Sequence, residues 1–349
     1  MRIVVNDIAA STGGALTVLK EFYNCVREND RKNEWIFLLG DELLEETENI
    51  QIKVLKDIKA SGLKKMWFDF VSGKKYIRKL QPDVVVSLQN IITFGLKIPQ
   101  IVYIHQSIPF QKTKKFSFLK RNERKLAVYQ YLIGSIIKRS AKKSYKVIVQ
   151  TEWMRQAVCE SCHIPQQRVV KAAPVVKEIT NTVSMDSFER NMFFYPTSNG
   201  IYKNNAAVQK ASAILTEQGM EHKVIMTLPT EKSQGNIQCV GRIPYEQVLE
   251  YYTKGTLVFP SYIESFGYPM AEARQVGTLV LAADTPFARE VLADYENAYF
   301  FDPFKPEELA SLIGRVIRGD ISLLPARNNC VEQSNGWHVM LDEIYQIGN

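Results

Sequence analysis

The 349-residue sequence has no run of about 18 apolar residues, the length that a bilayer-spanning helix needs. A signal peptide is also lacking, because Met1–Asp7 is too short and becomes polar too soon, so we expect a cytoplasmic protein. No Asp-x-Asp motif and no His/carboxylate cluster with metal-ligand spacing occurs in the chain. We therefore expect neither a metal site nor a cofactor.

Cysteine is scarce as well. The five cysteines, at positions 25, 159, 162, 239 and 330, form an odd and scattered set, which argues against a disulfide framework. One local run, Cys159-Glu160-Ser161-Cys162-His163, matches the c-type haem attachment motif. Haem attachment requires export to an oxidising compartment, and no export signal is present, so we interpret this match as a coincidence.

Length and composition predict a soluble globular protein with two domains. A chain of 349 residues exceeds the size at which single cores stop growing, and 46% hydrophobic with 23% charged residues is typical of globular proteins. Strand and helix patterns alternate almost throughout, which predicts parallel sheets covered by helices. The strands expected in the first half are Arg2–Asn6, Trp35–Leu39, Ile50–Leu55, Val84–Leu88, Ile101–His105 and Lys146–Val149. The helices expected there are Ala15–Glu28, Leu63–Leu80, Lys120–Lys143 and Trp153–Glu160.

A second series of strand patterns begins after a polar, weakly periodic stretch. Its expected strands are Met192–Tyr195, Lys223–Thr227, Ile237–Val240, Thr256–Phe259, Leu279–Ala282 and Tyr299–Phe301. We therefore divide the chain into a first domain at 1–174, a linker at 175–191 and a second domain at 192–332. The last segment, 333–349, is expected to form a short amphipathic helix led by Trp337.

The most informative segment is Pro260–Ala273. It follows a buried strand pattern, and Pro269 suits the first turn of the next helix. Glu264 therefore lies in a strand-to-helix loop, and Glu272 lies early in the helix. Backbone N–H groups around Ser265-Phe266-Gly267 suit a phosphate, and the two carboxylates can accept hydrogen bonds from sugar hydroxyls. A simpler interpretation is that Glu264 and Glu272 only stabilise the beginning of the helix, where the helix dipole favours acidic residues.

The complete block, Pro-Ser-x-x-Glu-Ser-Phe-Gly-x-Pro-x-x-Glu-Ala, resembles the donor-site signature of retaining nucleotide-sugar glycosyltransferases of family 4. The resemblance implies the GT-B fold: α/β, with two Rossmann-like domains whose parallel sheets face a cleft and a C-terminal helix crossing back to the first domain. It implies that Glu272 binds the ribose hydroxyls and Glu264 the donor sugar hydroxyls. Amides near Phe266 and Gly267 would hold the diphosphate. The nucleotide-diphosphate sugar would be a co-substrate.

Two motifs of the first domain fit the same interpretation. Gly13-Gly14 follows the first strand and opens a helix, where glycines let backbone approach an anion. His105 stands at the carboxyl end of a buried strand, where open α/β sheets bind ligands. A plain tight turn and a strand-capping histidine are the alternatives. By resemblance, the glycines approach the diphosphate and the acceptor, and His105 orients the donor sugar and is not a base.

In the second domain, Lys203-Asn204 follows the first strand pattern and a Gly-containing loop. Lys203 is expected to begin a helix and to neutralise phosphates. The family commonly has an Arg and a Lys here, and this chain has no such Arg; Thr197 and Ser198 stand near its place. Arg242 either compensates for the missing Arg or borders the nucleotide base. Lys203, with Glu264 and His105, completes the predicted catalytic set.

Positive charge is concentrated between Lys112 and Lys146. This stretch has twelve cations and one acid, Glu123, whereas the whole chain has a net charge of +7. Phe110, Phe116 and Phe118 lie beside it. Basic and aromatic residues together favour the anionic inner face of a membrane, at about 1 kcal/mol for each nearby cation. A solvated face and a nucleic-acid surface are the alternatives, and no recognition motif supports nucleic acid.

These features predict a metal-independent, retaining hexosyltransferase at the cytoplasmic face of a membrane. The acceptor would be a saccharide, most naturally a lipid-linked one of bacterial polysaccharide or cell-surface glycan synthesis. Three alternatives remain open at this stage: an inactive scaffold of the same fold, a nucleotide-sugar epimerase, and a nucleic-acid-binding protein. The missing Arg is the best support for the scaffold.

Overall fold

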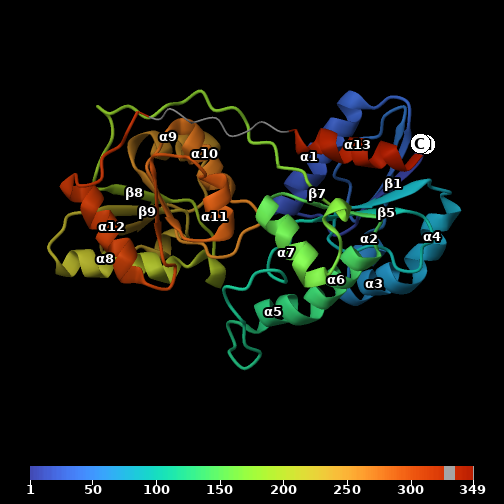
Figure 1. The fold of residues 1–349 in the computed structure, drawn as a ribbon, viewed down its shortest axis with the longest axis horizontal. Helices are drawn as coiled ribbons and strands as arrows, with labels where there is room; N and C mark the ends of the chain where they lie inside the picture. Colours follow the sequence, from blue (N-terminus) through green and yellow to red (C-terminus); the bar gives the residue numbers. More distant parts are fainter. Residues whose placement is uncertain (326–334, 349) are drawn as a thin grey trace. The chain divides into compact units, whose positions relative to one another are not determined.

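A computed structural model describes residues 1–325 and 335–348, in which strands and helices alternate along the chain (Figure 1). The chain forms two compact units. Unit 1 runs from Met1 to Val175 and takes in the C-terminal helix α13 (Gly336–Gly348), whereas unit 2 begins at Val176. The described part of the chain has no helix with both the length and the hydrophobicity needed to cross a bilayer.

Unit 1 contains a seven-stranded sheet in the order β3-β2-β1-β4-β5-β6-β7, with every neighbouring pair parallel. The strand order reverses between β1 and β4, and such reversals are where open sheets bind ligands. The strands are β1 (Arg2–Asp7), β2 (Glu34–Leu39), β3 (Ile50–Val54), β4 (Val84–Ser87), β5 (Gln100–Ile104), β6 (Lys146–Val149) and β7 (Val169–Lys171).

The helices of unit 1 include two that run through a π-helical turn. α3, η1 and α4 are continuous over 62–79, and α5, η2 and α6 are continuous over 124–143. Gly73 follows the first π turn, and a Cβ there would lie 2.5 Å from the carbonyl oxygen of Phe68. The bounds are α1 (Gly13–Asn29), α2 (Lys56–Lys59), α3 (Gly62–Trp67), η1 (Phe68–Ser72), α4 (Gly73–Lys79), α5 (Arg124–Ala127), η2 (Val128–Ile133), α6 (Gly134–Lys143), α7 (Glu152–Cys162) and η3 (Gln166–Arg168).

The predicted helix Lys120–Lys143 is wrong at its beginning. Residues 120–123 form a turn, and the helix begins at Arg124. The carboxylate of Glu123 accepts a hydrogen bond from Ser117 N at 2.9 Å, so the acid closes the preceding loop instead of lying within a helix.

Unit 2 contains a six-stranded parallel sheet in the order β10-β9-β8-β11-β12-β13, which again reverses beside its first strand. The strands are β8 (Met192–Tyr195), β9 (Lys223–Met226), β10 (Ile237–Cys239), β11 (Thr256–Phe259), β12 (Val280–Ala283) and β13 (Ala298–Phe301). The helices are η4 (Ile201–Lys203), α8 (Asn205–Glu217), η5 (Thr230–Lys232), α9 (Tyr245–Lys254), α10 (Tyr268–Val276), α11 (Pro286–Val291) and α12 (Pro306–Arg318).

The C-terminal helix is held on unit 1 by Trp337. Its ring is 4% exposed and lies 5.7 Å from the ring of Phe22 and 5.3 Å from that of Tyr103. Its Nε1–H donates to Glu21 at 3.2 Å. Figure 1 shows α13 lying beside α1, and the two helices are in contact. The end of the chain therefore completes the core on one face of the unit 1 sheet.

Trp337→Ala is expected to lower the free energy of unfolding by about 3–5 kcal/mol, because it leaves a large cavity between α1 and β5. Denaturant unfolding followed by circular dichroism measures the change. Trp67→Ala is the matched control: its side chain is 62% exposed, so its cost should stay within about 0.5 kcal/mol. Equal losses in the two variants would contradict this account of the core.

Candidate functional site

The predicted donor-site residues of unit 2 gather at the carboxyl edge of its sheet. β8 and β11 are neighbouring parallel strands, so the segments that follow them emerge at one edge. The segment after β8 leads to Lys203, and the segment after β11 carries Glu264. Sequence reasoning placed both near a sheet edge, and the topology brings them together.

Lys203 and Glu264 form an ion pair across this edge. Lys203 Nζ donates to Glu264 Oε1 at 2.6 Å, and about a fifth of each side chain is exposed (22% and 19%). Ser261 Oγ donates to the same carboxylate oxygen at 2.8 Å. Hydrogen bonds that involve ionised groups are the stronger class, so the three side chains hold one another in place.

The backbone around Lys203 is fixed by hydrogen bonds from β8 and from the segment after β11. The Tyr195 hydroxyl donates to Lys203 O at 2.6 Å, and Tyr262 N donates to Tyr202 O at 3.0 Å. The expectation that Lys203 begins a helix is wrong: it ends η4, and α8 begins at Asn205. The intervening Asn204 takes a left-handed conformation, which interrupts the helix.

Asn204 uses its amide within unit 2. Its Nδ2 donates to Pro260 O at 3.3 Å and to Pro303 O at 2.6 Å. These bonds tie the segment after β8 to the segments after β11 and β13. The side chain predicted to contact the donor is thus already engaged in positioning the loops around Lys203.

The loop from Glu264 to α10 has one position that only glycine fits. Gly267 has φ +99°, and a Cβ there would lie 2.6 Å from the Met270 side chain. Phe266 is buried and packs edge-on against Tyr268, with ring centroids 5.2 Å apart. Ser265 is partly exposed. This turn presents the first N–H groups of α10 at the same edge as Lys203, which suits an anion.

Glu272 lies mostly buried within α10. Tyr245 and Tyr252, two turns apart on α9, donate their hydroxyls to its two carboxylate oxygens, each at 3.2 Å. Burial raises the pKa of Glu272, and the two hydroxyl bonds oppose that rise. Each carboxylate oxygen can accept a second bond, so the group retains capacity for a vicinal diol.

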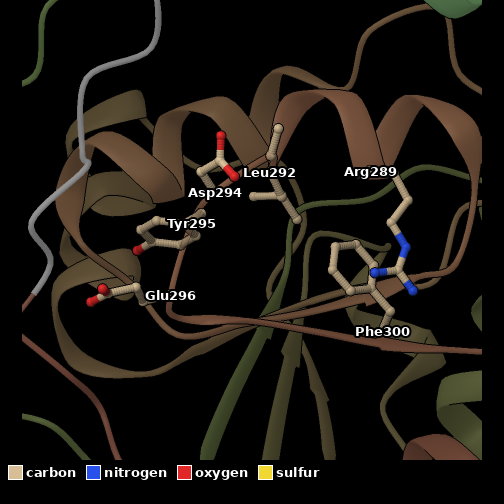
Figure 2. A pocket seen from close by; sticks show the side chains of 7 residues that line it. Arg289, Leu292, Asp294, Tyr295, Glu296 and Phe300 are labelled. Carbon is tan, nitrogen blue, oxygen red and sulfur yellow. The ribbon is translucent and has the colours of Figure 1, made fainter.

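The remaining cation of the predicted site, Arg242, follows β10 and is exposed. A surface hollow elsewhere in unit 2, formed by α11 and the segment leading into β13, contains none of the predicted residues (Figure 2). Its cation, Arg289, lies 3.8 Å over the ring of Phe300 and is paired with Asp284 at 2.7 Å. That hollow is therefore distinct from the predicted donor site.

In unit 1, Gly13 and Gly14 begin α1 in an exposed turn. Gly13 has φ +63°, so an L side chain there is strained whatever the space. Gly14 does not have a positive φ, and a Cβ added to either glycine would meet no atom within 4 Å. Packing within the protein thus gives no reason for a glycine at position 14, in contrast to Gly267.

His105 follows β5 and is held by Asn90. Backbone N–H groups of His105 and Gln106 donate to Asn90 Oδ1, at 2.8 and 2.9 Å. These two bonds fix the amide, and its Nδ2 lies 3.1 Å from His105 Nε2. Because Nδ2 is a donor, Nε2 accepts, which leaves the proton of the neutral imidazole on Nδ1.

Burial also favours the neutral form of the His105 ring. It lowers the pKa of His105 to about 4, so the ring is neutral at physiological pH. Nδ1 is buried and has no hydrogen-bond partner among the described residues. This geometry makes His105 a fixed N–H donor, which agrees with an orienting role and not with that of a base.

Sequence reasoning missed the residues that hold the site. Asn90 carries no motif, although its left-handed backbone is typical of Asn. Tyr245 and Tyr252 are seven residues apart on α9, a spacing that marks one face of a helix and no particular function. Asp7 ends β1 beside the reversal point, and burial raises its pKa to about 7, against the nearby Lys59 and Lys65. None of these features stands out in a sequence until the fold is known.

The basic segment differs from expectation in its aromatic residues. Phe110 and Phe116 are buried, whereas Phe118 is 46% exposed next to the exposed Leu119. Phe110 and Phe116 are therefore core residues of unit 1 and cannot contact a membrane. Several of the segment's cations are paired: Lys112 with Glu160 at 2.7 Å, and Lys146 with Glu343 at 2.8 Å.

Comparison with protein families gives two matches along the chain. Glycosyltransferase Family 4 matches residues 12–172, and Glycosyl transferases group 1 matches residues 216–337. The two ranges take in the Gly13-Gly14 turn and His105 in unit 1, and Glu264 and Glu272 in unit 2. The chain is a family 4 glycosyltransferase-like protein. Its Lys203 segment lies between the matched ranges. Curated protein sequences give no match.

Solved structures share the fold. WaaG, a glycosyltransferase involved in lipopolysaccharide biosynthesis, is 15% identical with a TM-score of 0.71, over 98% of this chain and 99% of its own. Sucrose-phosphate synthase (tll1590) from Thermosynechococcus elongatus is 14% identical with a TM-score of 0.68, over 99% of this chain and 98% of its own. Anabaena Alr3699/HepE in complex with UDP-glucose is 13% identical with a TM-score of 0.64, over 99% of this chain and 97% of its own. The predicted GT-B fold is confirmed.

Asn90→Asp is expected to raise the pKa of His105 from about 4 toward or above its ordinary value of about 6.5. A carboxylate oxygen then faces Nε2, which stabilises the imidazolium, and Asp tolerates the left-handed backbone of Asn90. NMR titration of the ring nitrogens measures the shift, with the other three histidines as internal references. An unchanged pKa and proton position would show that Asn90 does not control the ring.

Gly14→Ala is expected to leave the melting temperature unchanged or slightly higher, because the added methyl meets no protein atom and Ala favours the helix. If a ligand approaches this backbone, sugar transfer should fall by about tenfold, since a 1 Å displacement costs that much or more. Gly13→Ala is the contrasting variant and should lose stability through backbone strain. Full activity in Gly14→Ala would exclude a close ligand.

Proposed function

We propose that this family 4-like protein is a retaining glycosyltransferase that moves a hexose from a nucleotide-diphosphate sugar to a saccharide acceptor. The observation that carries the proposal is the Lys203–Glu264 pair at the carboxyl edge of the unit 2 sheet, with Glu272 on α10, the helix that follows this edge. A cation, a helix N-terminus and two carboxylates at one sheet edge match the phosphates and hydroxyls of such a donor.

Each group has a distinct part in donor binding. Lys203 has three N–H donors and gives one to Glu264, so the others serve the diphosphate. The first amides of α10, beside Phe266 and Gly267, serve the same charge. Glu264 accepts its two bonds through Oε1, and we assign Oε2 to the sugar hydroxyls. Glu272 takes the ribose diol.

The leaving diphosphate needs its growing negative charge met as the glycosidic bond to phosphate breaks. Lys203, Arg242 and the N-terminus of α10 supply positive charge without a metal ion. The acceptor oxygen bonds to the anomeric carbon on the face that the phosphate leaves, and its proton passes to a phosphate oxygen. His105, a neutral ring whose Nε2 is held by Asn90, orients the donor sugar and takes no proton. This route retains the anomeric configuration.

The acceptor is assigned to unit 1 and to a lipid-linked class, as in bacterial polysaccharide or cell-surface glycan synthesis. The supporting observations are the cation-rich segment Lys112–Lys146 and the exposed Phe118 and Leu119 within it. Together they suit an anionic membrane surface on the cytoplasmic side. A fold shared with a lipopolysaccharide glycosyltransferase agrees with this acceptor class.

Glu272→Gln is expected to weaken nucleotide-sugar binding by about tenfold or more, because a hydrogen bond to a charged group is worth about 1.5–3 kcal/mol. A panel of nucleotide-sugars first identifies the donor by thermal stabilisation, and calorimetry then compares the variants. Glu250→Gln, an exposed acid on α9, is the matched control and should bind like the original chain.

The outcomes separate the proposal from its alternatives. Donor affinity in Glu272→Gln equal to that of the original chain would refute the ribose assignment. Tight donor binding without transfer to any saccharide acceptor would favour the inactive scaffold, and conversion of donor without acceptor would favour the epimerase.

A further inference from the structure

The continuous helix over 62–79 exposes an apolar stripe. Leu63, Met66, Trp67 and Val71 are 74%, 48%, 62% and 39% exposed. Met66 and Trp67 follow Leu63 by three and four residues, and Val71 follows Trp67 by four, which places them on one face. Globular proteins bury such stripes against their cores, and here the core side of the helix is occupied by Phe68 and Ile77. The stripe is thus a second apolar face on a helix that already has one.

Cations surround the stripe. The helix has six, Lys64, Lys65, Lys74, Lys75, Arg78 and Lys79, and one acid, Asp69. Asp69 is buried and paired with Lys65 at 2.9 Å, so the exposed surface of the helix presents positive charge alone. An apolar face flanked by lysines is typical of helices that lie in the interface of an anionic membrane.

The helix over 124–143 also exposes apolar side chains. Phe70 of η1 stacks on Phe94 with ring centroids 4.5 Å apart, and Arg139 of α6 lies 5.4 Å over the same Phe94 ring, so both helices reach this residue of unit 1. The second helix exposes Tyr131 (40%) and Leu132 (60%), and the segment before it exposes Phe118 and Leu119. Both helices of unit 1 therefore expose apolar side chains among their cations.

From these observations we infer that the helix over 62–79 inserts its stripe into an anionic lipid surface. Charge complementarity selects the lipid over a neutral protein partner, because no exposed acid interrupts the cations of this helix. The inference extends the proposed function, since a lipid-linked acceptor would be met at that surface. It assigns membrane contact to residues outside Lys112–Lys146.

Vesicle binding by the full-length chain tests the inference. Vesicles of phosphatidylcholine with phosphatidylglycerol are compared with vesicles of phosphatidylcholine alone. Trp67 is the most exposed of the four tryptophans, so its fluorescence should shift to the blue on anionic vesicles and be quenched by brominated lipid. Trp67→Phe should retain binding and lose most of this signal.

Two variant sets separate the apolar and charged contributions. Leu63→Ser with Met66→Ser should partition about tenfold more weakly, since this loss corresponds to about 1.4 kcal/mol and burial of such side chains exceeds it. Lys74→Glu with Lys75→Glu should lose the preference for anionic vesicles. Met185→Ser, 58% exposed in unit 2, is the matched control and should bind unchanged.

Three outcomes would overturn the inference. Vesicle binding without quenching of Trp67 would assign contact to the Lys112–Lys146 segment alone. No vesicle binding would exclude the lipid altogether. An oligomer that dissociates in Leu63→Ser with Met66→Ser would show that a second copy covers the stripe. Donor-induced thermal stabilisation, measured on the same variants, reports on the proposed function separately and should stay unchanged.

Discussion

The candidate site depends on a topological constraint, the parallel pairing of β8 with β11. Parallel strands bring the residues after them to one edge, and this places Lys203 within 2.6 Å of Glu264 although they are 61 positions apart in the chain. Ser261, Tyr195 and Asn204 then fix the loops around the pair. The lysine that the proposed function assigns to a diphosphate is thus held in place before any ligand binds.

Unit 1 achieves a comparable preorganisation with a neutral group. Asn90 fixes the position of the His105 backbone and the protonation of its ring through one amide. Burial alone would lower the pKa of the ring, but it would leave the position of the proton open. A hydrogen-bond donor that is already oriented needs no reorganisation when a substrate binds, which is the general advantage of preorganised sites.

The sequence was sufficient to predict the GT-B fold and most strands, because buried parallel strands are short apolar runs and the Pro260–Ala273 block is specific. It also predicted that Glu264 lies in a loop and Glu272 in a helix. The partners of these residues and of His105 could not be predicted, since Lys203, Tyr252 and Asn90 reach them through tertiary contacts. The beginning of the helix at Arg124 and the burial of Phe116 depended on loop contacts in the same way.

A crystal structure of the protein with its nucleotide-sugar would test the central claim most directly. The account predicts phosphate oxygens within hydrogen-bonding distance of Lys203 Nζ and of the first amides of α10, with the ribose hydroxyls on the Glu272 carboxylate. A nucleotide bound away from the carboxyl ends of β8 and β11, or a diphosphate that leaves Lys203 bonded to Glu264 alone, would contradict it.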